Sequence, residues 1–160
     1  MTALNVPLEM IDGTSANFAD FAGKTVLVVN VASRCGLTPQ YEALEELQKT
    51  YGARGFTVLG VPSDQFKQEL STDGEIANYC STTWGVTFPM TSKTKVNGRN
   101  RHDLYKTLVK TKDHAGLAGP VLWNFEKFLV LPNGNIERFR PTTKPNDPAI
   151  IAAIEAGLAA

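Results

Sequence analysis

The segment that most constrains the fold is TVLVVNV, residues 25–31, a nearly unbroken run of β-branched and apolar residues. A strand of this composition has no polar face, so it must be covered on both sides, as the central strands of α/β sheets are. A second such run, FTVLGV at 56–61, follows after an amphipathic stretch. Strand, helix and strand within about 35 residues predict a βαβ unit with parallel strands and a right-handed crossover.

The helix between these strands should begin near Thr38 and Pro39, because threonine caps helix N-termini and proline fits the first helical position. Its apolar positions fall on one face and should pack on the sheet: Tyr41, Leu44, Leu47 and Tyr51. Its charged positions are expected to face solvent: Glu42, Glu45, Glu46 and Lys49.

The rest of the chain predicts two more helices, at 71–84 and 99–110, and a closing helix from 147 onward. KFLVL and IERF flank the turn signal Pro-Asn-Gly-Asn at 132–135, which predicts an antiparallel hairpin. Parallel strands followed by a hairpin indicate one α/β domain over 1–160, with a central mixed sheet flanked by helices.

The charge balance of the chain does not favour nucleic acid or a membrane as partner. Sixteen Lys and Arg residues balance sixteen Asp and Glu residues. This zero net charge gives no electrostatic reason to expect nucleic acid or stable membrane association. We expect a cytoplasmic protein, because the N-terminus lacks the basic and apolar blocks of a secretory signal. Structural zinc is not expected, since the possible ligands are scattered along the chain: Cys35, Cys80, His102 and His114.

Cys35 stands where the first buried strand gives way to the helix. The thiolate is the nucleophile in cysteine chemistry, and an ordinary cysteine is only roughly 3% thiolate at pH 7. The unpaired N–H groups and positive dipole at a helix N-terminus favour the thiolate, and the adjacent Arg34 can add positive potential. Placement alone leaves two interpretations open, a reactive thiol or a small apolar residue packed at a strand end.

Two motifs decide between them by resemblance. NVASRCGLTPQYEALEELQKTYGARGFTVLGVPSDQF, beginning at Asn30, and WNFEKFLV at 123–130 strongly resemble the glutathione peroxidase family. The likeness extends from about residue 8 to residue 150 and implies a thioredoxin-like fold with an N-terminal β-hairpin extension. Cys35 matches the family's peroxidatic position in NVAS-x-C-G-x-T, so this would be a cysteine-type, non-selenium member. The resemblance implies a catalytic group of Cys35, Gln65, Trp123 and Asn124.

These roles agree with the chemistry of the side chains. Amide N–H groups of Gln65 and Asn124, and the indole N–H of Trp123, can stabilise a thiolate or a departing hydroxide. The expected reaction begins when the Cys35 thiolate attacks a peroxide and becomes a sulfenic acid. A second thiol then forms a disulfide, which an external thiol donor reduces. No cofactor is implied beyond this co-substrate.

Cys80 falls where thioredoxin-dependent members carry their resolving cysteine, so the resemblance implies a Cys35–Cys80 disulfide. Disulfides need Cα atoms within about 7 Å. If the thiols start farther apart, the helix around 73–84 must unfold locally in each cycle. Two cysteines favour thioredoxin over glutathione as the reductant. The alternatives from the sequence are a peroxide sensor that passes oxidation to a partner protein, and a thiol–disulfide oxidoreductase, although Thr38 stands where a Cys-x-x-Cys motif needs its second cysteine.

Several positions depart from the family pattern. Ser63 and Asp64 replace Cys and Asn of the usual PCNQF, and FKQEL is one residue shorter than F-x-x-Q-E-P, with Leu70 in place of proline. If Asp64 points at Cys35 its charge should disfavour the thiolate, and if it points to solvent it should not affect Cys35. The short segment between Lys110 and Trp123 resembles members without the loop that assembles tetramers, which favours a monomer. We assign neither histidine to catalysis.

Overall fold

The computed structural model describes residues 4–159. Its elements in chain order are β1 (Pro7–Glu9), β2 (Ser15–Asn17), the 3-10 helix η1 (Phe18–Phe21), β3 (Thr25–Val31), α1 (Gln40–Tyr51), η2 (Gly52–Arg54), β4 (Phe56–Pro62), α2 (Asp73–Trp84), α3 (Asp103–Leu108), β5 (Lys127–Val130), β6 (Ile136–Phe139) and α4 (Pro148–Ala159). Within this range, no helix is both long and apolar enough to cross a membrane.

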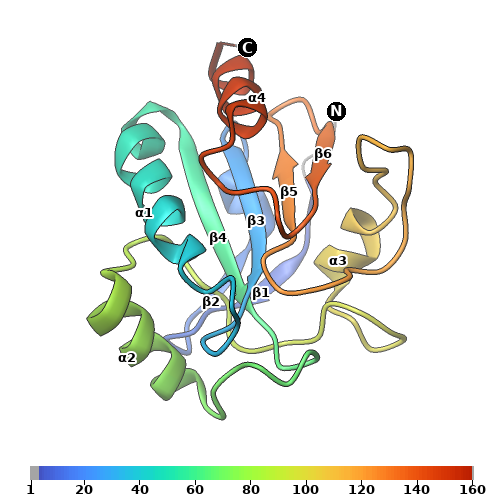
Figure 1. Ribbon diagram of the computed structural model, residues 1–160. Coiled ribbons are helices and arrows are strands. Elements are labelled where there is room, and N and C mark those ends of the chain that lie inside the picture. The colour runs from blue at the N-terminus through green and yellow to red at the C-terminus, as the bar shows by residue number, and fades with distance from the viewer. Residues whose placement is uncertain (1–3, 160) are drawn as a thin grey trace.

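The central sheet has the strand order β4-β3-β5-β6 (Figure 1). β3 and β4 are parallel, with Val28 opposite Leu59, and α1 makes the connection between them. β5 runs antiparallel to both β3 and β6. The predicted βαβ unit, the C-terminal hairpin and the mixed sheet are therefore confirmed. β1 and β2 form a separate two-stranded antiparallel sheet, which is the expected N-terminal hairpin.

Alternate residues of the buried strands pack into two cores on opposite faces of the sheet. Leu27, Val29 and Val31 of β3 belong to one core, together with buried residues of α1, α2 and α4. Val26 and Val28 belong to the other, which includes η1 and α3. Figure 1 shows α3 on the β6 side of the molecule and α1 beside β4. Helices thus cover both faces, as the unbroken apolar pattern of β3 predicts.

The start of α1 differs from the sequence expectation. The helix begins at Gln40, and its N-cap Pro39 has no side-chain capping bond. The Thr38 hydroxyl instead accepts from Cys35 N–H at 3.0 Å and donates to Ala32 O at 2.9 Å. Thr38 therefore stabilises the turn that holds Cys35, because its hydroxyl reaches backward along the chain and not forward into the helix.

Glu45 was expected on the solvent face of α1, and this prediction was wrong. The residue is only 3% exposed. Its carboxylate accepts from Thr87 N at 2.8 Å and from the Thr87 hydroxyl at 2.6 Å. This pairing joins α1 to the segment after α2, and a helical periodicity cannot reveal such a long-range contact. The helix expected at 99–110 is also shorter, since His102 Nδ1 accepts from Leu104 N at 3.1 Å and caps α3 just before Asp103.

Candidate active site

Cys35 lies in the turn between β3 and α1, and it is only 7% exposed. Leu37 N–H donates to Cys35 Sγ at 3.3 Å. Thr38 N–H donates to Cys35 O at 3.0 Å, and the Thr38 hydroxyl accepts from Cys35 N–H, so the turn is fixed on both sides of the sulfur. A backbone N–H aimed at the sulfur is a donor that stabilises the thiolate more than the neutral thiol.

The loop after β4 is bound directly to the Cys35 turn. Arg34 N–H donates to Gln68 O at 2.8 Å, and Ser33 N–H donates to Glu69 Oε1 at 3.0 Å. The Gln68 side chain in turn accepts from Asn124 Nδ2 at 3.0 Å. These bonds bring the amides of Gln68 and Asn124 together next to the segment that carries Cys35.

Gln65 does not join this arrangement. Its Oε1 accepts from Val96 N at 2.7 Å and from Asn97 N at 2.8 Å, and its Nε2 donates to Asn97 O at 2.9 Å. Both ends of the side-chain amide therefore hold the 96–97 loop. Of the two glutamines in DQFKQEL, the structure pairs Gln68 with Asn124. The sequence held a signal for this, because Gln68 and Glu69 match the Q-E of the family pattern once the missing residue is placed before Lys67.

The shortened loop closes through an uncommon backbone conformation. Lys67 has φ 59°, in the left-handed region that non-glycine residues seldom adopt. Ser63 is fully buried and its hydroxyl accepts from Gln65 N at 3.4 Å. Asp64 is exposed. The replacement of asparagine by Asp64 therefore adds a solvated charge outside the buried part of the site.

Asn30 at the end of β3 positions the segment with the two other predicted site residues. Its Nδ2 donates to Trp123 O at 3.1 Å, and its Oδ1 accepts from Glu126 N at 3.1 Å. Between these bonds, Phe125 has φ 66°, a strained conformation for a bulky residue. Strain of this kind persists only where neighbouring contacts hold it, and here the bonds of Asn30 hold the backbone on both sides of Phe125.

Trp123 and Asn124 have different environments. Trp123 is 39% exposed, and its ring lies 5.2 Å from the Phe66 ring, centroid to centroid. Asn124 is fully buried, and its Oδ1 has no hydrogen-bond partner. The segment thus carries an accessible aromatic ring next in sequence to a buried amide, a combination that suits a small polar substrate with an apolar substituent.

Cys80 lies on the buried face of α2, is 1% exposed, and belongs to the same core as Cys35. Neither cysteine is in a disulfide. Burial raises the pKa of the Cys80 thiol to about 11, the nearby Tyr41 hydroxyl opposes this, and the charge of Glu69 adds to it. In this state Cys80 is therefore protonated at neutral pH and is a poor nucleophile.

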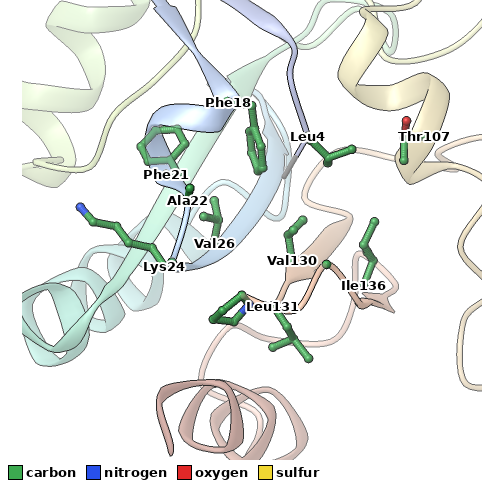
Figure 2. Close-up of a pocket in the computed structure, with 13 residues that line it drawn as sticks. Leu4, Phe18, Phe21, Ala22, Lys24, Val26, Thr107, Val130, Leu131 and Ile136 are labelled. Carbon is green, nitrogen blue, oxygen red and sulfur yellow. The ribbon is translucent and has the colours of Figure 1, made fainter. Parts of the chain in front are cut away.

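A cavity of about 400 Å³ lies away from this site (Figure 2). Its walls include Phe18, Val26, Val130 and Ile136, with Lys24 at one side. It adjoins the start of β3, whereas Cys35 follows the end of β3. The described residues 4–159 contain no group of three or more His, Cys, Asp or Glu side chains that could hold a metal ion.

Comparison with known proteins identifies the family. The family model described as "Glutathione peroxidase" matches residues 4–109. This chain belongs to the glutathione peroxidase family. "Thioredoxin/glutathione peroxidase BtuE" of Escherichia coli (strain K12) is 47% identical over 98% of this chain and 97% of its own length. "Hydroperoxy fatty acid reductase gpx1" of Synechocystis sp. is 47% identical over 87% of this chain and 86% of its own.

A solved structure confirms the fold. The crystal structure of Trgpx in apo form superposes with a TM-score of 0.78 at 33% identity, covering 99% of this chain and 97% of that chain. The predicted thioredoxin-like fold of a cysteine-type glutathione peroxidase is thus confirmed. The family also makes the protein a peroxidase, an enzyme that reduces peroxides, as the sequence resemblance implies.

Proposed function

We propose that this peroxidase reduces hydrogen peroxide and organic hydroperoxides through Cys35. The observation that carries the proposal is the hydrogen bond from Leu37 N–H to Cys35 Sγ at 3.3 Å. The thiolate attacks one peroxide oxygen, the O–O bond breaks, and Cys35 becomes a sulfenic acid while the other oxygen leaves as hydroxide or alkoxide. The leaving oxygen takes a proton and becomes water or an alcohol.

Donors that stabilise the leaving oxygen come from Trp123, Asn124 and Gln68 in this proposal. Gln68 takes the place that the sequence alone assigns to Gln65, because Gln68 contacts Asn124 and Gln65 is occupied by the 96–97 loop. The indole N–H and the amide N–H groups would be fixed before the charge develops, which is what makes such donors effective.

Recycling follows from the second cysteine. Cys80 would condense with the Cys35 sulfenic acid to give an intramolecular disulfide, and a dithiol protein such as thioredoxin would reduce it, with glutathione as the alternative donor. The name of the Escherichia coli relative includes both donors. No cofactor would be needed besides this co-substrate. We further propose that the enzyme works as a monomer in the cytoplasm, where thioredoxin systems keep thiols reduced.

Peroxide consumption with thioredoxin, thioredoxin reductase and NADPH tests the proposal. Cys35→Ser should lose roughly 10³-fold or more in activity, because the nucleophile is gone. Gln68→Ala should slow oxidation of Cys35 by about 10²-fold, the usual cost of one donor to a developing oxyanion. Gln65→Ala is the matched control and should leave that step within about threefold of wild type. Undiminished activity in Cys35→Ser would refute the proposal, and the opposite ranking of the glutamines would refute the reassignment.

Replacing thioredoxin with glutathione and glutathione reductase in the same assay identifies the donor. We expect turnover with thioredoxin to be the faster of the two, since a dithiol reduces an intramolecular disulfide without accumulating a mixed disulfide.

A further inference from the structure

Glu69 is a buried carboxylate between the two cysteine segments. Its Oε1 accepts from Ser33 N at 3.0 Å and from Leu70 N at 2.8 Å. Its Oε2 is buried without a hydrogen-bond partner. Across residues 4–159, Glu69 forms no salt bridge with a Lys, Arg or His side chain. A half-satisfied buried carboxylate costs stability, so its presence suggests a functional reason.

The charge of Glu69 also reaches the resolving cysteine. The Tyr41 hydroxyl lies beside the Cys80 thiol, and the Glu69 charge acts on both groups. Tyr41 is fully buried, and its hydroxyl lacks a well-formed hydrogen bond. Its ring is held by Phe125 at 5.4 Å and by Trp84 at 6.3 Å, centroid to centroid. A thiol, a phenol hydroxyl and a free carboxylate oxygen are thus gathered in one buried region.

Glu69 is also fixed to the Cys35 side of this region. Its bond to Ser33 N–H attaches it two residues before Cys35, and its neighbour Gln68 accepts from Arg34 N–H. When α2 loosens and Cys80 moves toward Cys35, Glu69 therefore stays with the sulfur that is attacked.

We propose that Glu69 is the proton acceptor for the Cys80 thiol during disulfide formation. This inference rests on the proposed function, in which Cys80 is the resolving cysteine. The thiol proton passes to Glu69, the Cys80 sulfur attacks the sulfur of the Cys35 sulfenic acid, the S–S bond forms and the S–O bond breaks. The departing hydroxide takes the proton from Glu69 and leaves as water, so the carboxylate is regenerated.

Other charged and titratable groups around this region are less suited to the role. Asp64 acts on Glu69 but is exposed, and Tyr79 of α2 acts on Tyr41. Lys93 Nζ donates to Ser71 O at 2.8 Å and to Leu70 O at 3.4 Å, which binds it to the segment that precedes α2. Glu69 is the buried carboxylate of this set, and its burial raises its pKa, which makes it a stronger base.

Glu69→Gln tests the proposal with little structural change, because the glutamine carbonyl can still accept from Ser33 N–H and Leu70 N–H. One equivalent of hydrogen peroxide is mixed with reduced enzyme, and the sulfenic acid and the disulfide are followed by rapid alkylation and mass spectrometry. We expect sulfenic acid formation within about twofold of wild type and disulfide formation slowed by roughly 10²-fold or more. Glu42→Gln, an exposed change on α1, should alter neither rate.

The pH profile separates proton transfer from a merely structural role. In wild type, the rate of disulfide formation should fall toward acid pH as Glu69 is protonated. In Glu69→Gln, this decrease at acid pH should be absent. A Glu69→Gln enzyme that forms the disulfide at the wild-type rate overturns the proposal. If that variant does not fold, a wild-type profile that is flat between pH 4 and 7 overturns it as well. Failure of the proposed function looks different, since Cys80→Ser would then still turn over with thioredoxin.

Discussion

The two helices that carry or support the cysteines are attached to the molecule very differently. α1, which follows Cys35, buries six residues: Gln40, Tyr41, Leu44, Glu45, Leu47 and Tyr51. α2, which carries Cys80, has the same length but buries only Ile76 and Cys80. Figure 1 shows α1 alongside β4 and α2 at the periphery, beyond the end of the sheet.

This difference assigns separate mechanical roles to the two thiols. The Cys35 turn must hold its sulfur and donors in one arrangement, and it is fixed by backbone bonds to the loop that contains Gln68. Cys80 must cross to Cys35, and its helix contributes only two buried side chains, Ile76 and Cys80, to the core that it would leave. Elements with few buried contacts are those that open at low free-energy cost. The comparison therefore supports local unfolding of α2 as the step that brings the thiols together.

The largest expected effect is the loss of turnover when the Cys80 thiol is removed. Cys80→Ser should reduce thioredoxin-driven turnover by roughly 10²-fold or more, because the sulfenic acid has no internal partner. Oxidation of Cys35 by one equivalent of peroxide should remain near the wild-type rate, since the Cys35 turn is intact. Stopped-flow kinetics and trapping of the sulfenic acid with dimedone measure both. Full turnover in this variant would remove Cys80 from the mechanism.

The next effect compares core truncations in the two helices. Leu44→Ala should lower the free energy of unfolding by about 2–5 kcal/mol, since Leu44 is fully buried on the sheet. Ile76→Ala removes an equally buried side chain. Because α2 can detach locally, this substitution can lower the free energy of global unfolding by no more than the free energy with which α2 packs on the rest of the protein. We therefore expect a smaller loss in urea unfolding for Ile76→Ala.

Hydrogen exchange shows where each loss occurs. Ile76→Ala should speed amide exchange in α2 while β3 keeps its protection, whereas Leu44→Ala should weaken protection throughout. Equal losses in both variants, with α2 and β3 exchanging together, would mean that α2 is part of the same cooperative unit and would contradict the comparison.

The sequence predicted the region around α1 better than the details of the site. The unbroken apolar runs at 25–31 and 56–61 are local sequence patterns, so the βαβ unit could be predicted directly from them. The burial of Glu45 could not be predicted in this way, because its partner Thr87 is 42 positions away in the chain. The sequence prediction named Gln65, and the contacts of Gln65 with Asn97 and of Gln68 with Asn124, on which the proposal for Gln68 rests, depend on segments far apart in the chain.

The role of Glu69 was invisible in the sequence for a related reason. The sequence KQEL does not indicate that the Glu69 carboxylate accepts from Ser33 N–H, or that its Oε2 lacks a hydrogen-bond partner. Motifs identify the residue types that a reaction needs, whereas burial and partners, which set protonation and reactivity, arise only when distant segments pack together.

The last effect is the contribution of the Cys80 thiol on α2 to the pH dependence of stability. Burial raises the pKa of Cys80 to about 11 in the folded protein, against about 8.5 for an unfolded cysteine. The unfolded chain therefore loses this proton first as pH rises. The stability that the buried neutral thiol contributes is complete below pH 8.5 and is lost between about pH 8.5 and 11, by about 3 kcal/mol at most.

Cys80→Ala isolates this contribution, because Lys127 titrates in the opposite sense. Burial lowers the pKa of Lys127 to about 7, so its contribution to stability grows as pH rises from 7 toward its unfolded value. Lys127 is present in both proteins, so the difference between their urea-unfolding curves cancels it. The free energies of unfolding of wild type and Cys80→Ala should therefore converge by up to about 3 kcal/mol between pH 8.5 and 11. Hydrogen exchange should place most of this change in the α2 amides. Parallel curves for the two proteins would show that the thiol is already solvated, and that α2 is open far more often than its two buried side chains imply.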